Sequence, residues 1–229
     1  MLLALDARQP LALTVNPLLA PATGPRTVAA IERELQRLPH LAGDSRHNRR
    51  EVKAAMIDAR AMKTAAEALG GRLPDSDEGI HMVISGRFAL WDYVPAVLDI
   101  AGCRIDALTV ATLGFSVRNI VKLCSLVDAN QIGEVYLLAS HYFAGTSAKI
   151  YAVAVEEFAK RPEQMKFLSV RQHAKILAIA LADGRRVTLE SSANLRSTKN
   201  IEAATAFGDP RLFEFHQAWI RDLFKAARA

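Results

Sequence analysis

Residues 173–194 read HAKILAIALADGRRVTLESSAN, and this stretch decides how the rest of the chain is interpreted. Its two halves are rich in residues typical of β-strands, and Asp183-Gly184 lies between them. An Asp-Gly pair between two such runs favours a two-residue type I′ turn, because both turn positions need a positive φ. The sequence therefore predicts a β-hairpin with a two-residue turn.

The predicted turn determines which residues face each other across the hairpin. With two residues in the turn, His173 should lie opposite Asn194, and Lys175 opposite Ser192. Residues two apart on a strand share a face, so the four side chains should gather at the open end of the hairpin. An imidazole, an ammonium, a hydroxyl and a carboxamide together suit an oxyanion such as phosphate.

The chain before the hairpin alternates strand-like and helix-like segments, which is typical of α/β architecture. Strands are expected at 80–87, 105–115, 134–143 and 166–170, and helices at 89–102, 116–131, 147–162 and 210–227. On the last helix, the residues expected to form the buried stripe are Leu212, Phe215, Trp219 and Phe224. We therefore predict an α/β fold with a mixed β-sheet flanked by helices and an N-terminal helical extension.

The first 78 residues have a different character from the rest of the chain. Residues 1–26 contain four prolines, a density that interrupts helices and strands, so an extended arm is expected there. Helices are predicted at 27–38 and 43–71, and the second has a basic run near its start (Arg46, His47, Arg49, Arg50 and Lys53). The predicted division is a proline-rich arm and helical extension at 1–78, followed by a second domain at 79–229.

Composition limits the class of protein. The 229 residues are 51% hydrophobic and 23% charged, as in globular proteins. Cys103 and Cys124 lack the spacing of a metal site or a disulfide framework, so no metal and a cytoplasmic location are expected. Asp6 and Arg8 interrupt the apolar start, so no membrane association is expected. The formal net charge of +5 is compatible with a nucleic-acid partner.

The strings HAK (173–175), SSAN (191–194) and KNIE (199–202) resemble the H-x-K…S-x-N…N-x-E signature of the phospholipase D superfamily, particularly its single-motif endonuclease branch. The resemblance implies a phospholipase D-like fold for 79–229 and a catalytic site formed by His173, Lys175, Ser192, Asn194 and Glu202. Two positions depart from the family pattern. Ala180 replaces the usual aspartate, and Ser191 replaces a common glycine.

The resemblance also implies the chemistry of the site. In this superfamily one histidine attacks the phosphodiester to give a phosphohistidine, a second protonates the leaving oxygen, and no metal or other cofactor is needed. This chain has one copy of the motif, because His141 is followed by Tyr142 and Phe143 and not by a lysine two residues on. A homodimer that brings two copies together is therefore expected.

Further residues are candidates for substrate binding. They could extend the positive field or line the cleft, and they are Asn200, Arg196, Lys199, Arg87 and His141, with Tyr142 beside the last. The function expected from the resemblance is a metal-independent phosphodiesterase, a nuclease that acts on nucleic acid, with DNA favoured over RNA. Two alternatives are a nucleic-acid-binding module that has lost turnover, motivated by Ala180 and Ser191, and a phospholipase.

Overall fold

The structure is a computed structural model, and it describes residues 46–227 except 85, 87 and 197–199, with side chains from residue 56 onward. The predicted arm at 1–26, the predicted helix at 27–38 and the side chains of the basic run lie outside this range. The described elements are α2 (Arg46–Ala68), β1 (Gly79–Ile84), the 3-10 helix η3 (Leu90–Asp92), α3 (Tyr93–Ala101), β2 (Ile105–Thr112), α4 (Val117–Asp128), β3 (Ile132–Ser140), α5 (His141–Thr146), α6 (Ala148–Ala159), β4 (Met165–Val170), β5 (Ile176–Leu181), β6 (Arg186–Ser191), β7 (Glu202–Phe207) and α7 (Pro210–Ala226).

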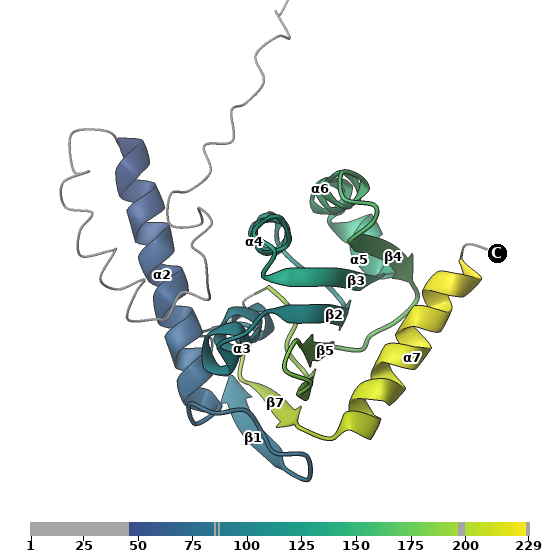
Figure 1. The fold of residues 1–229 in the computed structure, drawn as a ribbon. Helices are drawn as coiled ribbons and strands as arrows, with labels where there is room; N and C mark the ends of the chain where they lie inside the picture. Colours follow the sequence, from purple (N-terminus) through teal and green to yellow (C-terminus); the bar gives the residue numbers. More distant parts are fainter. Residues whose placement is uncertain (1–45, 85, 87, 197–199, 228–229) are drawn as a thin grey trace, which may run out of the picture.

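The strands form one seven-stranded sheet in the order β1-β7-β6-β5-β2-β3-β4. β2, β3 and β4 run parallel, whereas β5 pairs antiparallel with β2 and the remaining pairs are antiparallel. The fold is therefore a mixed sheet flanked by helices, as the sequence predicts (Figure 1). Strand β7 was not predicted, because its short run EAATAF, residues 202–207, has little of the β-branched and aromatic character that marks a strand.

Helices cover both faces of the sheet, and side chains alternate between the two layers along each strand. Leu137 points into the large core that α3, α4 and α6 cover, whereas its neighbour Leu138 packs with Ile220 and Phe224 of α7. Figure 1 shows α4 and α6 on one side of the sheet and α7 on the other. Both faces of β2, β3 and β5 are thus buried, which leaves the strand ends as the places where polar groups can gather.

The C-terminal half of α2 belongs to the same core as the sheet. Met62, Ala65 and Leu69 are buried with residues of α3 and the sheet. Asp58 on α2 also forms ion pairs with Arg118 and Lys122 of α4, both at 2.6 Å. The domain boundary between residues 78 and 79 stays a prediction.

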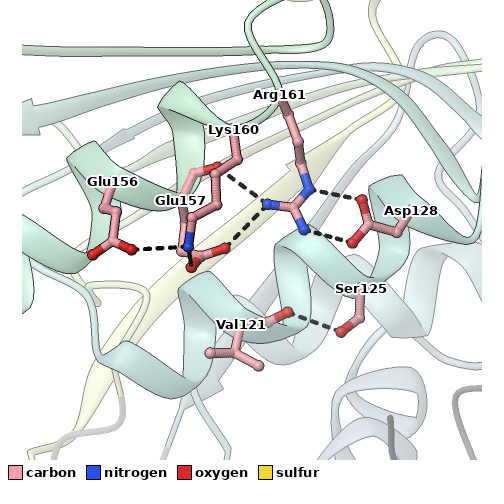
Figure 2. A network of polar contacts seen from close by, with 7 residues as sticks. All are labelled: Val121, Ser125, Asp128, Glu156, Glu157, Lys160 and Arg161. Atoms are coloured by element: carbon pink, nitrogen blue, oxygen red, sulfur yellow. Dashed lines mark hydrogen bonds and ion pairs between the residues drawn. The ribbon is translucent and has the colours of Figure 1, made fainter. Parts of the chain in front are cut away.

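A network of charges joins the ends of α4 and α6 (Figure 2). Arg161 donates two hydrogen bonds to Asp128, at 2.7 and 2.6 Å, and also bonds Glu157. Lys160 pairs with Glu156 at 2.9 Å and with Glu157 at 2.7 Å. The hydrogen bonds from Lys160 and Arg161 lower the pKa of the Glu157 carboxyl. The network lies just before β3 and β4 begin, so it fixes the amino-terminal edge of the sheet.

The buried stripe of α7 differs from the predicted one. Phe213, His216, Ile220 and Phe224 are buried, whereas Phe215 is 63% exposed. The prediction was right for Phe224 and wrong for Phe215, because this helix carries apolar residues on several faces and their period alone does not identify the buried face. His216 completes the stripe although it is polar, because its ring nitrogens bond Glu190 and Trp219.

The hairpin β5–β6 turns through three residues, so the predicted two-residue turn was wrong. Leu181 N donates to Arg185 O at 3.0 Å, and Gly184 N donates to Leu181 O at 3.1 Å. Gly184 has a φ of 93°, whereas Asp183 does not adopt a positive φ, and its side chain accepts a hydrogen bond from Arg185 N. This geometry matches a type I turn followed by a glycine bulge. Pairing is consequently displaced by one residue, and Lys175 faces Ser191.

Candidate active site

A cavity of about 920 Å³ opens at the carboxyl ends of the parallel strands. This edge is where open α/β sheets commonly bind ligands. The lining residues come from the ends of β2 and β3, from the start of α5 and from the loop between β4 and β5, and they are Leu113, Ser140, His141, Tyr142, Arg171, Gln172 and His173.

The loop that carries His173 is tied to the sheet by Gln172. Its Nε2 donates to Thr112 O at 2.8 Å and to Leu138 O at 3.3 Å. These carbonyls lie at or near the ends of β2 and β3, so one side chain anchors the loop to two strands. His173 is therefore presented to the cavity by a fixed segment.

His173 and Lys175 are in direct contact. Lys175 Nζ lies 2.8 Å from His173 Nδ1 and donates to His173 O at 2.8 Å. Burial lowers the pKa of Lys175, which is 9% exposed, and the negative charge of Glu202 opposes that shift. While Lys175 is charged it is the donor to Nδ1, so a neutral His173 ring carries its proton on Nε2.

Ser192 and Glu202 form the second half of the cluster. Ser192 Oγ donates a close hydrogen bond to Glu202 Oε2 and accepts one from Ala203 N at 3.0 Å. Glu202 is the first residue of β7, so this bond holds the end of β6 against β7. The charge of Glu202 also acts on Lys175, so this carboxylate interacts with both Ser192 and Lys175. The predicted pairing of Lys175 with Ser192 across the ladder is wrong.

Asn194 connects the cluster to β2. Its Oδ1 accepts a hydrogen bond from Leu113 N at 3.1 Å. Since an amide nitrogen cannot accept that bond, the orientation of the carboxamide is fixed, and its Nδ2 is the group left to donate to a ligand. Leu113 lines the same cavity as His173, so Asn194 supports the cavity wall.

His141 lines the cavity together with His173. Its Nδ1 lies 3.3 Å from Ser169 Oγ on β4, a contact that orients the ring. The chain leaves β3 at Ser140 and enters α5 at His141, whereas the sequence predicted a strand through residue 143. Tyr142 therefore stands on the first turn of a short helix at the cavity.

Two more of the predicted binding residues, Arg196 and Asn200, are described and are not among the residues that line the cavity. Arg196 is exposed, and its guanidinium carbon lies 6.0 Å from the centre of the Phe143 ring. Asn200 is also exposed and precedes β7 by two residues. Arg87 and Lys199 lie outside the described residues.

Arg171 was not predicted as a site residue, yet it lines the cavity. Its position in the sequence could have identified it, because it is a basic residue two positions before His173. The residue adds a permanent positive charge beside His173. The described cavity lining therefore has an arginine and two histidines and no carboxylate.

In the described part of the chain, no three His, Cys, Asp or Glu side chains gather in a way that could hold a metal ion. No helix there is long and apolar enough to cross a membrane.

Comparisons with known proteins give structural matches only. No protein-family model and no curated protein matches the sequence. Among solved structures, the chain is similar to Nuc from Salmonella typhimurium, described as a phospholipase D family member, with 19% identity, a TM-score of 0.45, and coverage of 65% of this chain and 95% of that one.

Two further solved structures are similar to the chain. NucT from Helicobacter pylori has 13% identity and a TM-score of 0.43, with coverage of 65% of this chain and 97% of that one. Polyphosphate kinase from Porphyromonas gingivalis has 12% identity and a TM-score of 0.44, with coverage of 62% of this chain. The chain spans 26% of the length of that kinase.

Proposed function

We propose that the protein is a metal-independent phosphodiesterase of the phospholipase D type that cuts nucleic acid. The observation that carries this proposal is Lys175, which is 9% exposed and hydrogen-bonded to His173 beside an open cavity. Within the described residues Lys175 forms no ion pair with a carboxylate. A buried ammonium is costly unless an anion compensates it, and a bound phosphate supplies that charge.

The arrangement supports nucleophilic attack by His173. Its Nε2 forms a bond to phosphorus while the bond to the leaving oxygen breaks, which gives a phosphohistidine. Lys175 and the Nδ2 group of Asn194 stabilise the charge on the non-bridging oxygens. Water then attacks phosphorus, breaks the P–N bond and releases the second product.

Substrate binding can also prepare His173 for attack. Lys175 donates to Nδ1, which keeps the ring proton on Nε2, where it blocks the nucleophile. A phosphate oxygen that accepts the Lys175 hydrogen bond frees Nδ1 to hold the proton. Nε2 then has the lone pair that attack requires.

A homodimer completes the proposed mechanism. The chain has one copy of the motif, so the partner subunit's His173 would protonate the leaving oxygen and later accept a proton from water. The nucleic-acid substrate fits the formal net charge of +5, and DNA stays the favoured substrate. Cys103 and Cys124 are free thiols, in keeping with the proposed cytoplasmic location.

Cleavage in EDTA tests the proposed function. Labelled DNA and RNA are incubated with the wild type, with His173→Ala, and with His81→Ala as a control at an exposed histidine on β1. Cleavage that resists EDTA, is lost in His173→Ala and is kept in His81→Ala supports the proposal.

Binding without cleavage by the wild type would contradict the enzyme and favour a binding module of the same fold. One observation favours that second candidate. Ala180, which stands where the family usually has an aspartate, is buried with Phe213 between β5 and α7. That apolar layer has no place for the missing carboxylate.

A further inference from the structure

We propose that the cavity beside His173 takes single-stranded nucleic acid, with one base stacked on Tyr142 and a phosphate held by Arg171. This inference rests on the proposed function, because it assigns the form of substrate for the same site. DNA and RNA share the bases and phosphates that it invokes.

Tyr142 has an exposed ring at the cavity. Its side chain is 69% exposed, although it lines a cavity that also contains His141 and His173. An aromatic ring in this setting presents a face to any flat ligand that enters the cavity. Stacking of bases on aromatic side chains is the sequence-tolerant contact by which proteins hold single strands.

Arg171 places a positive charge at the same cavity as Tyr142. It directly follows Val170, and Val170 pairs with Ser140, the residue before His141. Arg171 and the start of α5 therefore leave two neighbouring parallel strands at the same level. Arg171 is exposed, and within the described residues it forms no ion pair with a carboxylate, so its guanidinium is available for a phosphate.

The depth of the site favours a single strand over a duplex. His173 lines the cavity and contacts Lys175, which is 9% exposed, so a phosphate attacked by His173 has to enter the cavity. A duplex is stiff over the length of a binding site, and its bases are stacked and paired inside the helix. A single strand bends into the cavity and turns one base toward Tyr142 without breaking a pair. The cavity of about 920 Å³ has the size of ordinary small-ligand sites, which suits a nucleotide of the strand.

Binding measurements with an uncleaved complex test the strand preference. Full-length His173→Ala is titrated into a short labelled oligonucleotide, single-stranded or annealed to its complement, in DNA and RNA versions, and fluorescence anisotropy is recorded. We expect the single strand to bind about tenfold more tightly or better, in at least one of the two versions.

Tyr142 variants in the same background test the stacking. Tyr142→Ala should weaken single-strand binding about tenfold, whereas Tyr142→Phe should retain it, because the ring and not the hydroxyl makes the contact. Phe215→Ala is the matched control, since Phe215 is 63% exposed on α7 across the sheet. We expect no change for that control.

The salt dependence separates the phosphate contact from the base contact. Arg171→Gln should reduce the slope of log K against log salt by about 0.7, as expected for one lost single-strand phosphate contact, whereas Tyr142→Ala should leave the slope unchanged. Arg211→Gln is the control, because Arg211 is highly exposed at the start of α7, near the end of β7 away from Glu202.

Equal affinity for single strand and duplex in both versions would overturn the inference, as would unchanged single-strand binding in Tyr142→Ala. These outcomes are independent of catalysis. If the wild type cuts single strand and duplex equally and Tyr142→Ala does not change single-strand binding, the proposed function stands and this inference fails. If the protein cuts nothing but binds single strands through Tyr142, the proposed function fails and this inference stands.

Discussion

Lys175 lowers the stability of the fold and provides a donor for the proposed function. The residue is 9% exposed, and burial lowers its pKa, so the folded state holds the lysine proton less tightly than the unfolded chain. The charged form therefore reduces the stability of the fold while it provides the donor that a phosphate needs. Sites of this kind are commonly less stable than apolar replacements of similar size.

Replacing this lysine should change activity and stability in opposite directions. Lys175→Met should lower cleavage by about a hundredfold or more, because one charge-assisted donor to the transferring group is lost. Its unfolding free energy at neutral pH should equal or exceed that of the wild type. The difference should shrink as the pH rises toward the ordinary lysine pKa of about 10.4. In this range the unfolded chain binds more protons at Lys175 than the folded protein does, so the stability of the wild type increases with pH.

Denaturant unfolding across this pH range, together with cleavage rates, measures both effects. Lys175→Arg is the matched variant, because it retains a charge that cannot be neutralised. A Lys175→Met protein that is clearly less stable at neutral pH and no less active would contradict the assigned role.

Glu202 should influence the pH dependence of the reaction through Lys175. Its negative charge raises the pKa of the lysine, so Glu202→Gln should lower that pKa further while it retains an oxygen that accepts from Ser192. The alkaline limb of log kcat/KM against pH should therefore move to lower pH. Ser192→Ala retains the charge and should leave the limb in place. An alkaline limb that does not move in Glu202→Gln would show that its charge does not act on the lysine during catalysis.

Among the elements, β6 and α7 are held together by a chain of polar contacts. His216 Nε2 lies 2.7 Å from Glu190 Oε1, and Trp219 Nε1 donates to His216 Nδ1 at 3.1 Å. Because Trp219 can only donate, Nδ1 is the acceptor and the proton of the neutral ring is on Nε2. Glu190 directly precedes Ser191 and Ser192, so these bonds fix the end of the strand that carries the site.

Removing this histidine should destabilise the fold. His216→Ala should lower the free energy of unfolding by about 2–3 kcal/mol, because the partly buried Trp219 Nε1 loses its acceptor and a small cavity forms. Phe215→Ala, at the exposed neighbour, should change it by less than about 0.5 kcal/mol. Urea denaturation of the two variants makes the comparison. Equal effects would show that the polar contacts do not stabilise the packing of α7.

At the scale of the whole molecule, the site is arranged at one edge of the sheet and the structural charges at the other. The cavity opens where β2, β3 and β4 end, whereas the network around Arg161 lies before β3 and β4 begin. Each chain carries one His173, so the proposed mechanism requires a second copy of the molecule at the cavity edge.

Subunit mixing tests that requirement. If each catalytic centre needs a histidine from both subunits, wild type and His173→Ala mixed in equal amounts and allowed to exchange should keep about a quarter of the activity, because only wild-type pairs are active. Independent subunits would keep about half. Light scattering provides the second measurement, and a mass near the monomer value of 25.0 kDa at working concentration would contradict the dimer.

The sequence by itself determined the α/β architecture, the existence of the hairpin and the identity of His173 and Lys175 as neighbours. These features depend on local patterns: the alternation of strand-like and helix-like runs, the Asp-Gly pair between two β-rich runs, and the spacing of two residues between His173 and Lys175. The mixed sheet confirmed the predicted class, and the contact of His173 with Lys175 follows from their closeness in the chain.

The tertiary structure alone decided the hairpin register, the place of β7 and the composition of the cavity. The register depended on whether Asp183 adopts a positive φ, and it does not. The link of Ser192 to Glu202 depended on a strand that returns to the sheet after a loop, and Arg171 and Tyr142 line one cavity because β3 and β4 end side by side. Such contacts join residues far apart in the chain, and local patterns do not encode them.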